Sequence, residues 1–301
     1  MTYSYEVQSI TTFDGEIYQL TNGANRFIIT TPGNLGMPPI QFQTKKGYKQ
    51  DGVSETGYTL NPRSFALTFR HTSCSRDQLW VIRQELINIL RPNRGGQLTY
   101  NIVRSDGRKF SIDARSYSPV FEEKSADQWD EWSYTEILQF EAFNPIWYET
   151  DEITETVVNQ VAGQLTFPIT FDDNNIFFED ASSYGTLAIT YTGTWYSYPT
   201  IRVTAPFTRI QIIHQELNKV ITLLYGSTTG YVDINLETLQ ITNQLNANLF
   251  NYLAPISDLQ AFKITPDPEI AGGINTLDFY INDYDSDTEI TVMYKNRFIG
   301  I

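Results

Sequence analysis

Alternation of apolar and polar residues in short runs is the feature of this sequence that most constrains its fold. Runs such as Phe65/Leu67/Phe69 place every second side chain on one face, which is the period of a β-strand. Aromatic residues make up 14% of the 301 residues, and they suit half-buried strand surfaces better than helix faces. The sequence therefore predicts a mainly β protein.

One segment, Ser75 to Arg91, has the helical period instead. Ser75 and Gln78 have the spacing of a capping box, and Asp77 in the first turn and Arg91 in the last turn complement the helix dipole. Pro92 is expected to end the helix. Its apolar stripe comprises Leu79, Ile82, Leu86, Ile89 and Leu90.

Alternating runs on both sides of this helix predict an N-terminal β-sandwich-like domain. Asp106-Gly107 is a tight-turn signal between two such runs, so a hairpin is expected there. A further strand ends at Asn144-Pro145, because proline lacks a donor for the ladder. The runs are Phe65/Leu67/Phe69, Leu98/Tyr100/Ile102, Phe110/Ile112/Ala114 and Trp132/Tyr134/Leu138/Phe140/Ala142.

Residues 31–64 break this pattern. Thr31 to Pro39 is rich in proline and glycine, and Lys45 to Gly57 is polar. A connection of this length in a compact domain is usually functional or mobile. We expect an arm or loop that reaches a neighbouring subunit.

A chain of this length suggests two domains of roughly 100–200 residues each, and we place the boundary between residues 1–149 and 150–301. The second half contains short strands and turns spaced as in an antiparallel β-sandwich. Its runs include Leu187/Ile189/Tyr191, Ile201/Val203, Ile210/Ile212, Ile221/Leu223/Tyr225, Val232/Ile234/Leu236, Leu277/Phe279/Ile281 and Ile290/Val292/Tyr294.

Charge is distributed unevenly. Residues 1–150 carry 15 Lys and Arg against 17 Asp and Glu, a net −2, whereas residues 151–301 carry 6 against 18, a net −12. The second half would repel nucleic acid and anionic membrane. No apolar run of about 20 residues occurs, so no membrane insertion is expected. The N-terminal residues lack the pattern of a signal peptide, and the single cysteine, Cys74, leaves no partner for an intramolecular disulfide.

The sequence offers few candidates for catalysis. His71 and Cys74 are spaced H-x-x-C, but zinc needs two more ligands. A Cys–His nucleophile pair between Cys74 and His71 or His214 is the weaker interpretation of a lone thiol, and His214 has no evident partner. Adjacent acids in a polar loop are more often solvated than paired across a sugar. Those acids are Glu122, Glu123, Asp130 and Glu131.

Two loops invite a metal or ligand interpretation. Asp283, Asp285, Asp287 and Glu289 have alternate spacing that suits calcium, but the run lacks the glycine and final glutamate of an EF-hand, so a solvent-exposed hairpin tip is favoured. The Gly226 to Gly230 stretch is interpreted as a hairpin turn. Aromatic residues able to stack on sugars, or to fill a core, are Tyr184, Tyr191, Trp195, Tyr196 and Tyr198. We therefore predict no catalytic site, metal or cofactor.

Several stretches, taken in order along nearly the whole chain, resemble the distal tail protein (Dit) family of long-tailed phages. They are Met37-Pro-Pro-Ile40, Gln50-Asp-Gly52, Leu60-Asn-Pro-Arg63, Ser75 to Pro92, Gly95 to Tyr100, Asp106-Gly-Arg108, Phe143 to Tyr148, Gly273 to Phe279 and Thr291 to Gly300. Each stretch is weak alone, and their order and spacing carry the resemblance.

The resemblance implies an N-terminal belt domain in a six-membered ring around the tail channel and a galectin-like C-terminal sandwich. Such a ring joins the tail tube protein to the tail-tip hub of a virion tail, and DNA passes through it without specific binding. A cyclic ring needs two different contact patches on each subunit, and residues 31–64 are the expected donor. The residues expected at this inter-subunit contact are Met37, Pro38, Pro39, Tyr48 and Arg63.

Three functions remain open from the sequence. The first is a structural tail subunit without catalysis. The second is a carbohydrate-binding adhesin that recognises a host-surface glycan through the C-terminal sandwich. The third, an enzyme, has the least support because no convergent catalytic set exists.

Overall fold

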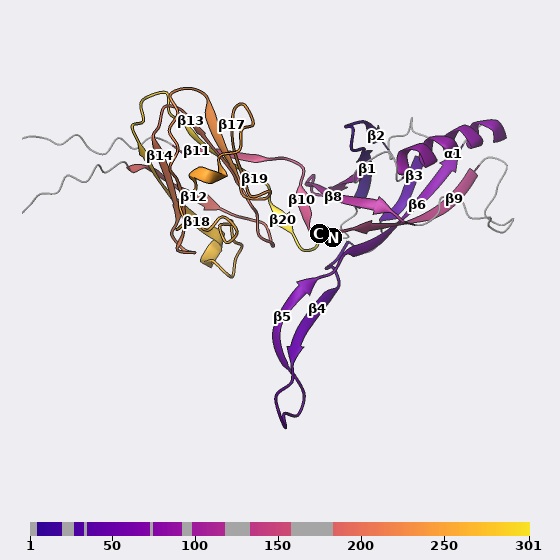
Figure 1. Ribbon diagram of the computed structural model, residues 1–301. Coiled ribbons are helices and arrows are strands. Elements are labelled where there is room, and N and C mark those ends of the chain that lie inside the picture. Colours follow the sequence, from indigo (N-terminus) through magenta and orange to yellow (C-terminus); the bar gives the residue numbers. More distant parts are fainter. Residues whose placement is uncertain are drawn as a thin grey trace, which may run out of the picture. The chain divides into compact units, whose positions relative to one another are not determined.

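The structure is a computed structural model in which two compact units can be described (Figure 1). The first unit comprises Met1–Asp151 and Phe298–Ile301, and the second comprises Glu152–Arg297. The last four residues thus group with the first unit, whereas the sequence placed them in the second half. The residues that the structure describes are 5–19, 27–32, 35–72, 75–91, 98–117, 133–157 and 183–301.

The first unit is built on one antiparallel sheet whose strands follow the order β2-β1-β7-β8-β9-β6-β3. The short strand β10 (Trp147–Glu149) pairs with β8, and the last strand, β20 (Arg297–Phe298), brings Phe298 back into this unit. The main strands are β1 (Tyr5–Thr11), β2 (Ile17–Gln19), β3 (Phe27–Pro32), β6 (Arg63–Thr72), β7 (Leu98–Arg104), β8 (Lys109–Ser116) and β9 (Ser133–Ala142).

Strand β8 carries the sheet from one half to the other. It pairs with β7 from Lys109 to Ala114 and then with β9 through Arg115 and Ser116. The two halves of this sheet share one core, so the expected sandwich-like domain is confirmed, with β8 continuous between its two layers. Large aromatic side chains fill that core, with Tyr100 and Phe140 at a ring distance of 4.8 Å.

Helix α1 (Arg76–Leu90) lies where the helical period predicts it, and it is the only α-helix in the described part of the chain. The Ser75 hydroxyl accepts a hydrogen bond from the Gln78 backbone N–H at 3.3 Å, so the expected N-cap is confirmed. Every residue of the predicted apolar stripe is buried. Arg91 is the C-cap and does not lie in the last turn, and Pro92 lies outside the described residues.

The second unit is an antiparallel sandwich of two sheets, as the sequence predicts. One sheet has the order β11-β19-β13-β16-β17 and the other β12-β18-β14-β15. Alternate residues of each strand enter one core between the sheets. The strands are β11 (Ile153–Val157), β12 (Ser183–Thr190), β13 (Thr200–Thr204), β14 (Arg209–His214), β15 (Lys219–Leu223), β16 (Tyr231–Asn235), β17 (Gln240–Asn243), β18 (Ile274–Asn282) and β19 (Ile290–Tyr294). Two 3-10 turns, η3 (Phe250–Tyr252) and η4 (Ala271–Gly273), lie in its loops.

Two loops interpreted as hairpin turns are instead crossings between the two sheets. Gly226 to Gly230 leaves β15 in one sheet and enters β16 in the other, and Asp283 to Glu289 leads in the same way from β18 to β19. The hairpin interpretation is wrong because β15 pairs with β14 and β16 pairs with β13. The alternation of apolar and polar residues along a strand shows which side chains face a core. It does not show which sheet the strand joins.

Candidate assembly interface

The catalytic candidates fall into two groups. Cys74, Glu122, Glu123, Asp130 and Glu131 lie outside the described residues, so the Cys–His pair and the acid pairs are not placed. His71 lies on β6, and the structure describes its backbone alone.

His214 has a partner that the sequence did not indicate. It is fully buried at the end of β14, where its Nε2 lies 3.1 Å from the Asn275 side-chain oxygen. Its Nδ1 accepts a 3.4 Å hydrogen bond from the Leu217 backbone N–H, so the neutral ring satisfies both nitrogens. Burial lowers the pKa of His214, against smaller opposing effects of Asn275 and Glu216. The histidine therefore belongs to the core of the second unit.

The acidic crossing Asp283 to Glu289 is organised by its own hydrogen bonds. Asp283 accepts from the Thr208 hydroxyl at 2.6 Å, and Asp285 accepts from the Asp287 backbone N–H at 2.8 Å. Within the described ranges, no group of three or more His, Cys, Asp or Glu side chains is arranged to hold a metal ion.

The aromatic residues considered for sugar stacking are divided between core and surface. Tyr184 and Tyr191 are buried, and the Tyr191 hydroxyl donates to the Trp195 carbonyl oxygen at 2.6 Å. Tyr196 is half-buried, and its hydroxyl donates to Glu269 at 2.5 Å. The two buried rings have no face to offer a ligand.

The expected connection 31–64 is shorter than predicted, because residues 31–32 belong to β3 and residues 63–64 to β6. Between these two strands, residues 40–60 form a two-stranded hairpin, here called the arm. It consists of β4 (Ile40–Lys45) and β5 (Ser54–Leu60), which pair with each other and with no other described strand. Figure 1 shows the arm projecting from the body of the first unit. An isolated two-stranded hairpin is at best marginally stable in water, so this arm is expected to gain stability from a partner.

The arm has one apolar face, formed by two cross-strand pairs. Ile40 faces Leu60, and Phe42 faces Tyr58. Directly paired residues of an antiparallel ladder project to the same side, so these four side chains lie together. Phe42 is 57% exposed and Tyr58 is 49% exposed. The apolar face of the arm is therefore open to solvent in a single chain.

The opposite face of the arm is polar. Gln41 pairs with Thr59, and Gln43 pairs with Gly57. Strands with this alternation normally lie with one side on a core and the other in water. The apolar and polar residues of the arm alternate as in a strand with one covered face, yet the apolar face is exposed to solvent. This combination is typical of a protein interface.

The five residues expected at an inter-subunit contact lie in different surroundings. Met37 and Pro39 are exposed before β4, and Tyr48 is 93% exposed in the loop at the tip of the arm. Pro38 is buried, and Arg63 is 0% exposed. Met37, Pro39 and Tyr48 are therefore available for an inter-subunit contact, whereas the buried Arg63 side chain is not.

Arg63 instead fixes the base of the arm from within its own chain. Its guanidinium donates to the carbonyl oxygens of Gly36, of Pro145 at 3.0 Å and of Ile299 at 2.7 Å. Burial lowers the pKa of Arg63 to about 10, so the group stays charged at neutral pH. The sequence motif Leu60-Asn-Pro-Arg63 gave no sign of this role.

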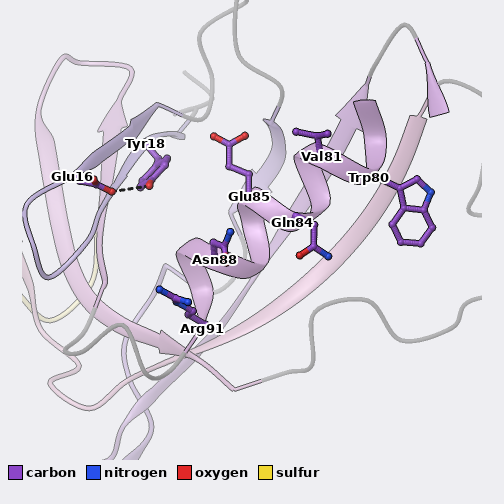
Figure 2. A pocket seen from close by; sticks show the side chains of 8 residues that line it. All are labelled: Glu16, Tyr18, Trp80, Val81, Gln84, Glu85, Asn88 and Arg91. Atoms are coloured by element: carbon purple, nitrogen blue, oxygen red, sulfur yellow. Dashed lines mark hydrogen bonds between the residues drawn. The ribbon is translucent and has the colours of Figure 1, made fainter. Parts of the chain in front are cut away.

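A groove lies on the outer surface of the first unit, between α1 and β2 (Figure 2). Its volume is about 850 Å³. Trp80 and Val81 on α1 are 48% and 58% exposed. Figure 2 shows the α1 residues on one side and Glu16 with Tyr18 on the other, joined by a hydrogen bond of 2.8 Å. The lining residues are Glu16, Tyr18, Trp80, Val81, Gln84, Glu85, Asn88 and Arg91.

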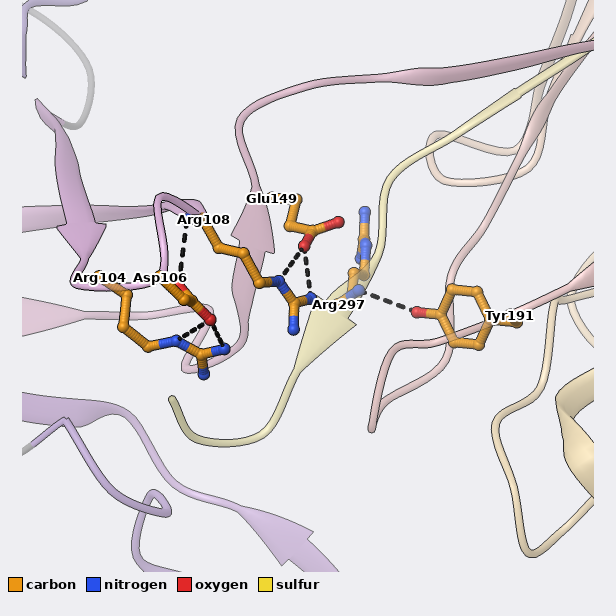
Figure 3. Close-up of polar contacts among 6 residues, drawn as sticks. All are labelled: Arg104, Asp106, Arg108, Glu149, Tyr191 and Arg297. Carbon is orange, nitrogen blue, oxygen red and sulfur yellow. Dashed lines mark hydrogen bonds and ion pairs between the residues drawn. The ribbon is translucent and has the colours of Figure 1, made fainter. Parts of the chain in front are cut away.

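Polar contacts fix the turn of the β7–β8 hairpin (Figure 3). Arg104 donates to Asp106 at 2.8 Å and lowers the pKa of that carboxyl to about 2. Arg108 donates to Glu149 on β10 at 2.8 Å. In the second unit, the Arg297 backbone N–H donates to the Tyr191 hydroxyl at 2.9 Å. These contacts stabilise the local structure of each unit.

No helix in the described ranges is both long enough and apolar enough to cross a membrane.

Neither a protein-family model nor a curated relative matches the sequence. Among solved structures, the chain is similar to the Dit protein (gp 19.1) of phage SPP1, with a TM-score of 0.65 and 15% identity over 99% of this chain and 100% of that one. That protein is described as a paradigm of the hub adsorption apparatus in phages that infect Gram-positive hosts.

Two structures of the phage P2 baseplate in its activated conformation, one with calcium and one with strontium, also contain a similar chain. The TM-scores are 0.52 and 0.53, with 12% identity over 97% of this chain and 98% of theirs. At these identities the likeness establishes the fold. The expected resemblance is confirmed at that level: the chain has the fold of the phage Dit protein over nearly its whole length.

Proposed function

We propose that this protein is a structural subunit of a phage tail, in which six copies form a ring between the tail tube and the tail-tip hub. The observation that carries the proposal is the full-length likeness to the SPP1 Dit protein, which spans both units of the chain. In this proposal the protein is part of the virion, its partners are further copies of itself, the tail tube protein and the hub, and DNA passes through the ring without specific binding.

The arm supports assembly into a ring. A cyclic ring needs heterologous contacts, in which two different surfaces of each subunit meet. The arm offers one such surface, because its apolar face carries Phe42 and Tyr58 in the open. Burying it on a neighbour would remove apolar area from water, which is favourable by about 25 cal/mol for each Å².

We further propose that the protein is not an enzyme. The support comes from the placed candidates. His214 is engaged in the core, and in the Asp283 to Glu289 crossing Asp285 caps the backbone while Asp283 accepts from the Thr208 hydroxyl. Glycan binding by the second unit, the adhesin alternative, has less support because two of its aromatic candidates are core residues.

The test is the mass of the purified full-length chain by light scattering, with negative-stain images of the same peak. Six copies of a 34.5 kDa chain give 207 kDa. We expect a six-fold ring of that mass. A chain that stays monomeric at every concentration, and does not co-assemble with tail tube protein, contradicts the proposal.

A matched pair of variants links the ring to the arm. The double substitution Phe42→Ser with Tyr58→Ser removes the apolar face, whereas Gln41→Ser with Thr59→Ser changes the polar face of the same two strands. We expect the first variant to keep the monomer fold by circular dichroism and to lose the ring, and the second to keep both. Equal assembly by the two variants would show that the apolar face of the arm is not an interface.

A further inference from the structure

Residues 298–301, here called the strap, follow the second unit in the chain and pack back into the first unit. Phe298 is buried and meets Phe110 edge to face at a ring distance of 5.4 Å. The carbonyl oxygen of Ile299 accepts a hydrogen bond from Arg63 at 2.7 Å. The strap is therefore anchored in the first unit, although the whole second unit separates it from the rest of that unit in the sequence.

The strap contacts both ends of the arm. Before β4, the Ile301 backbone N–H donates to the Leu35 carbonyl oxygen at 3.2 Å, and a Cβ on Gly300 would lie 3.1 Å from the Gly36 carbonyl carbon. After β5, Arg63 donates to Gly36 as well as to the strap. The strands of the arm pair with no other described strand, so these contacts at its base hold it on the first unit.

The fold of the second unit brings the two ends of that unit together. Strands β11 and β19, which lie near these ends, are antiparallel neighbours, and Ile153 faces Tyr294 in their ladder. The Tyr294 hydroxyl also donates to Glu155 on β11 at 2.8 Å. In the folded unit, the chain therefore leaves towards the strap close to the point where it enters.

An unfolded second unit would not hold these ends together. The strap would then be joined to the first unit by a flexible loop of about 150 residues, and closing such a loop is roughly a thousandfold less probable than closing a direct connection. A folded unit that keeps the strap near the base of the arm raises its effective concentration there.

We propose that the second unit controls the arm through the strap: it delivers residues 298–301 to the base of the arm, which is fixed only when the second unit is folded. This inference stands apart from the proposed ring, because every group that it uses lies in one chain. A chain whose second unit has not folded therefore carries an arm with an unfixed base.

Hydrogen exchange of two full-length variants tests this coupling. Phe279→Asp places an unpaired charge in the core of the second unit, where Phe279 is 0% exposed, and is expected to unfold that unit. Tyr280→Asp is the matched control, because it places the same group at the next, partly exposed position of β18. Exchange of β13 reports whether the second unit is folded.

The amides of Asn61 and Ile301 report on the base of the arm, because they donate to the carbonyl oxygens of Pro39 and Leu35. We expect their exchange to become at least about tenfold faster in Phe279→Asp alone, with the exchange of α1 unchanged. Unchanged exchange of these two amides beside an unfolded second unit overturns the inference. Loss of protection in α1 also overturns it, because the first unit as a whole would then depend on the second.

Gly300→Val tests the strap while the second unit stays folded. The added side chain would enter the space in which Gly300 meets Gly36, so the strap is expected to leave its place against the arm. We expect the Asn61 amide to exchange at least about tenfold faster, with the exchange of β13 unchanged. Full protection of Asn61 in this variant would show that the strap does not fix the arm, and overturns the inference whatever the result for Phe279→Asp.

Discussion

Arg63 donates a 2.7 Å hydrogen bond to the carbonyl oxygen of Ile299, a residue 236 positions later in the chain. The same guanidinium holds Gly36 and Pro145, so one buried side chain ties the start of the arm, the end of β9 and the C-terminus together. The contact is close: a Cβ on Gly300 would lie 3.1 Å from the Gly36 carbonyl carbon. The base of the arm is therefore fixed by the last residues of the chain.

Replacing Arg63 with Met is expected to destabilise the first unit by about 3 kcal/mol, because carbonyl groups that Arg63 now satisfies would remain buried without a donor. The measurement is thermal unfolding, with hydrogen exchange of β6 as the local readout. Arg70→Met is the control, because Arg70 lies on the same strand and is exposed. A similar loss of stability in both variants would mean that Arg63 acts through general properties of β6 and not through its hydrogen bonds to the three carbonyl groups.

The return of the C-terminus predicts an effect of Phe298 on the first unit. Phe298 is buried and meets Phe110 edge to face at 5.4 Å. Phe298→Ala is expected to cost about 3 kcal/mol, with increased exchange in β8. Phe250→Ala, at a half-exposed position in the second unit, is expected to cost less than about 1 kcal/mol. Unchanged exchange in β8 would contradict the packing of Phe298 in the first core.

Much of the architecture could be predicted from the spacing of apolar residues and from the residues that cap helices and form turns. The capped helix from Ser75 and the Asp106-Gly107 hairpin follow from local rules, because a cap or a tight turn is specified by neighbouring residues. Each alternating run named in the second half lies on a strand or runs one or two residues past its end. These features are local, and local signals survive without knowledge of the rest of the chain.

Features that depend on distant segments were missed. The sheet crossings at Gly226 and Asp283 follow from strand order, which alternation does not encode. The hydrogen bond from Arg63 to Ile299 could not be predicted for the same reason, because its two residues are far apart in the chain. The sequence predicted an arm or loop in this segment but not its strands, although Ile40/Phe42 alternates with polar residues.

His214 is expected to make the second unit sensitive to mild acid. Burial lowers the pKa of His214 from its ordinary value of 6.5. In the unfolded chain the ring binds a proton near that pH, whereas the folded ring does so only at lower pH. Stability is therefore complete above pH 6.5 and falls as the pH drops below it.

His214→Gln provides the comparison, because it keeps a polar side chain near Asn275 and removes the titration. We expect the unfolding temperature of the wild type to fall more steeply than that of the variant between about pH 7 and pH 5.5. Parallel pH profiles for the two proteins would rule out His214 as the source of the acid sensitivity.

Two adjacent glycines of η4 share a backbone conformation but differ in the space available for a side chain. Gly272 has φ +66° and Gly273 has φ +64°, so alanine is strained at both positions. A Cβ on Gly272 would meet only the Ile274 side chain at 3.8 Å, whereas a Cβ on Gly273 would lie 2.5 Å from the Tyr191 carbonyl oxygen. The Tyr191 backbone N–H also donates to the Gly273 carbonyl oxygen at 2.9 Å, so the two segments cannot move apart without losing that bond.

Gly272→Ala is therefore expected to cost about 1–2 kcal/mol from the left-handed conformation alone. Gly273→Ala is expected to cost about 2 kcal/mol more, because the added methyl group forces apart two hydrogen-bonded backbone segments. Urea unfolding of the two variants, followed by the aromatic circular dichroism of the second unit, measures the difference. Equal losses would show that the approach of Tyr191 to Gly273 relaxes freely, and that the conformation of the turn alone selects glycine at both positions.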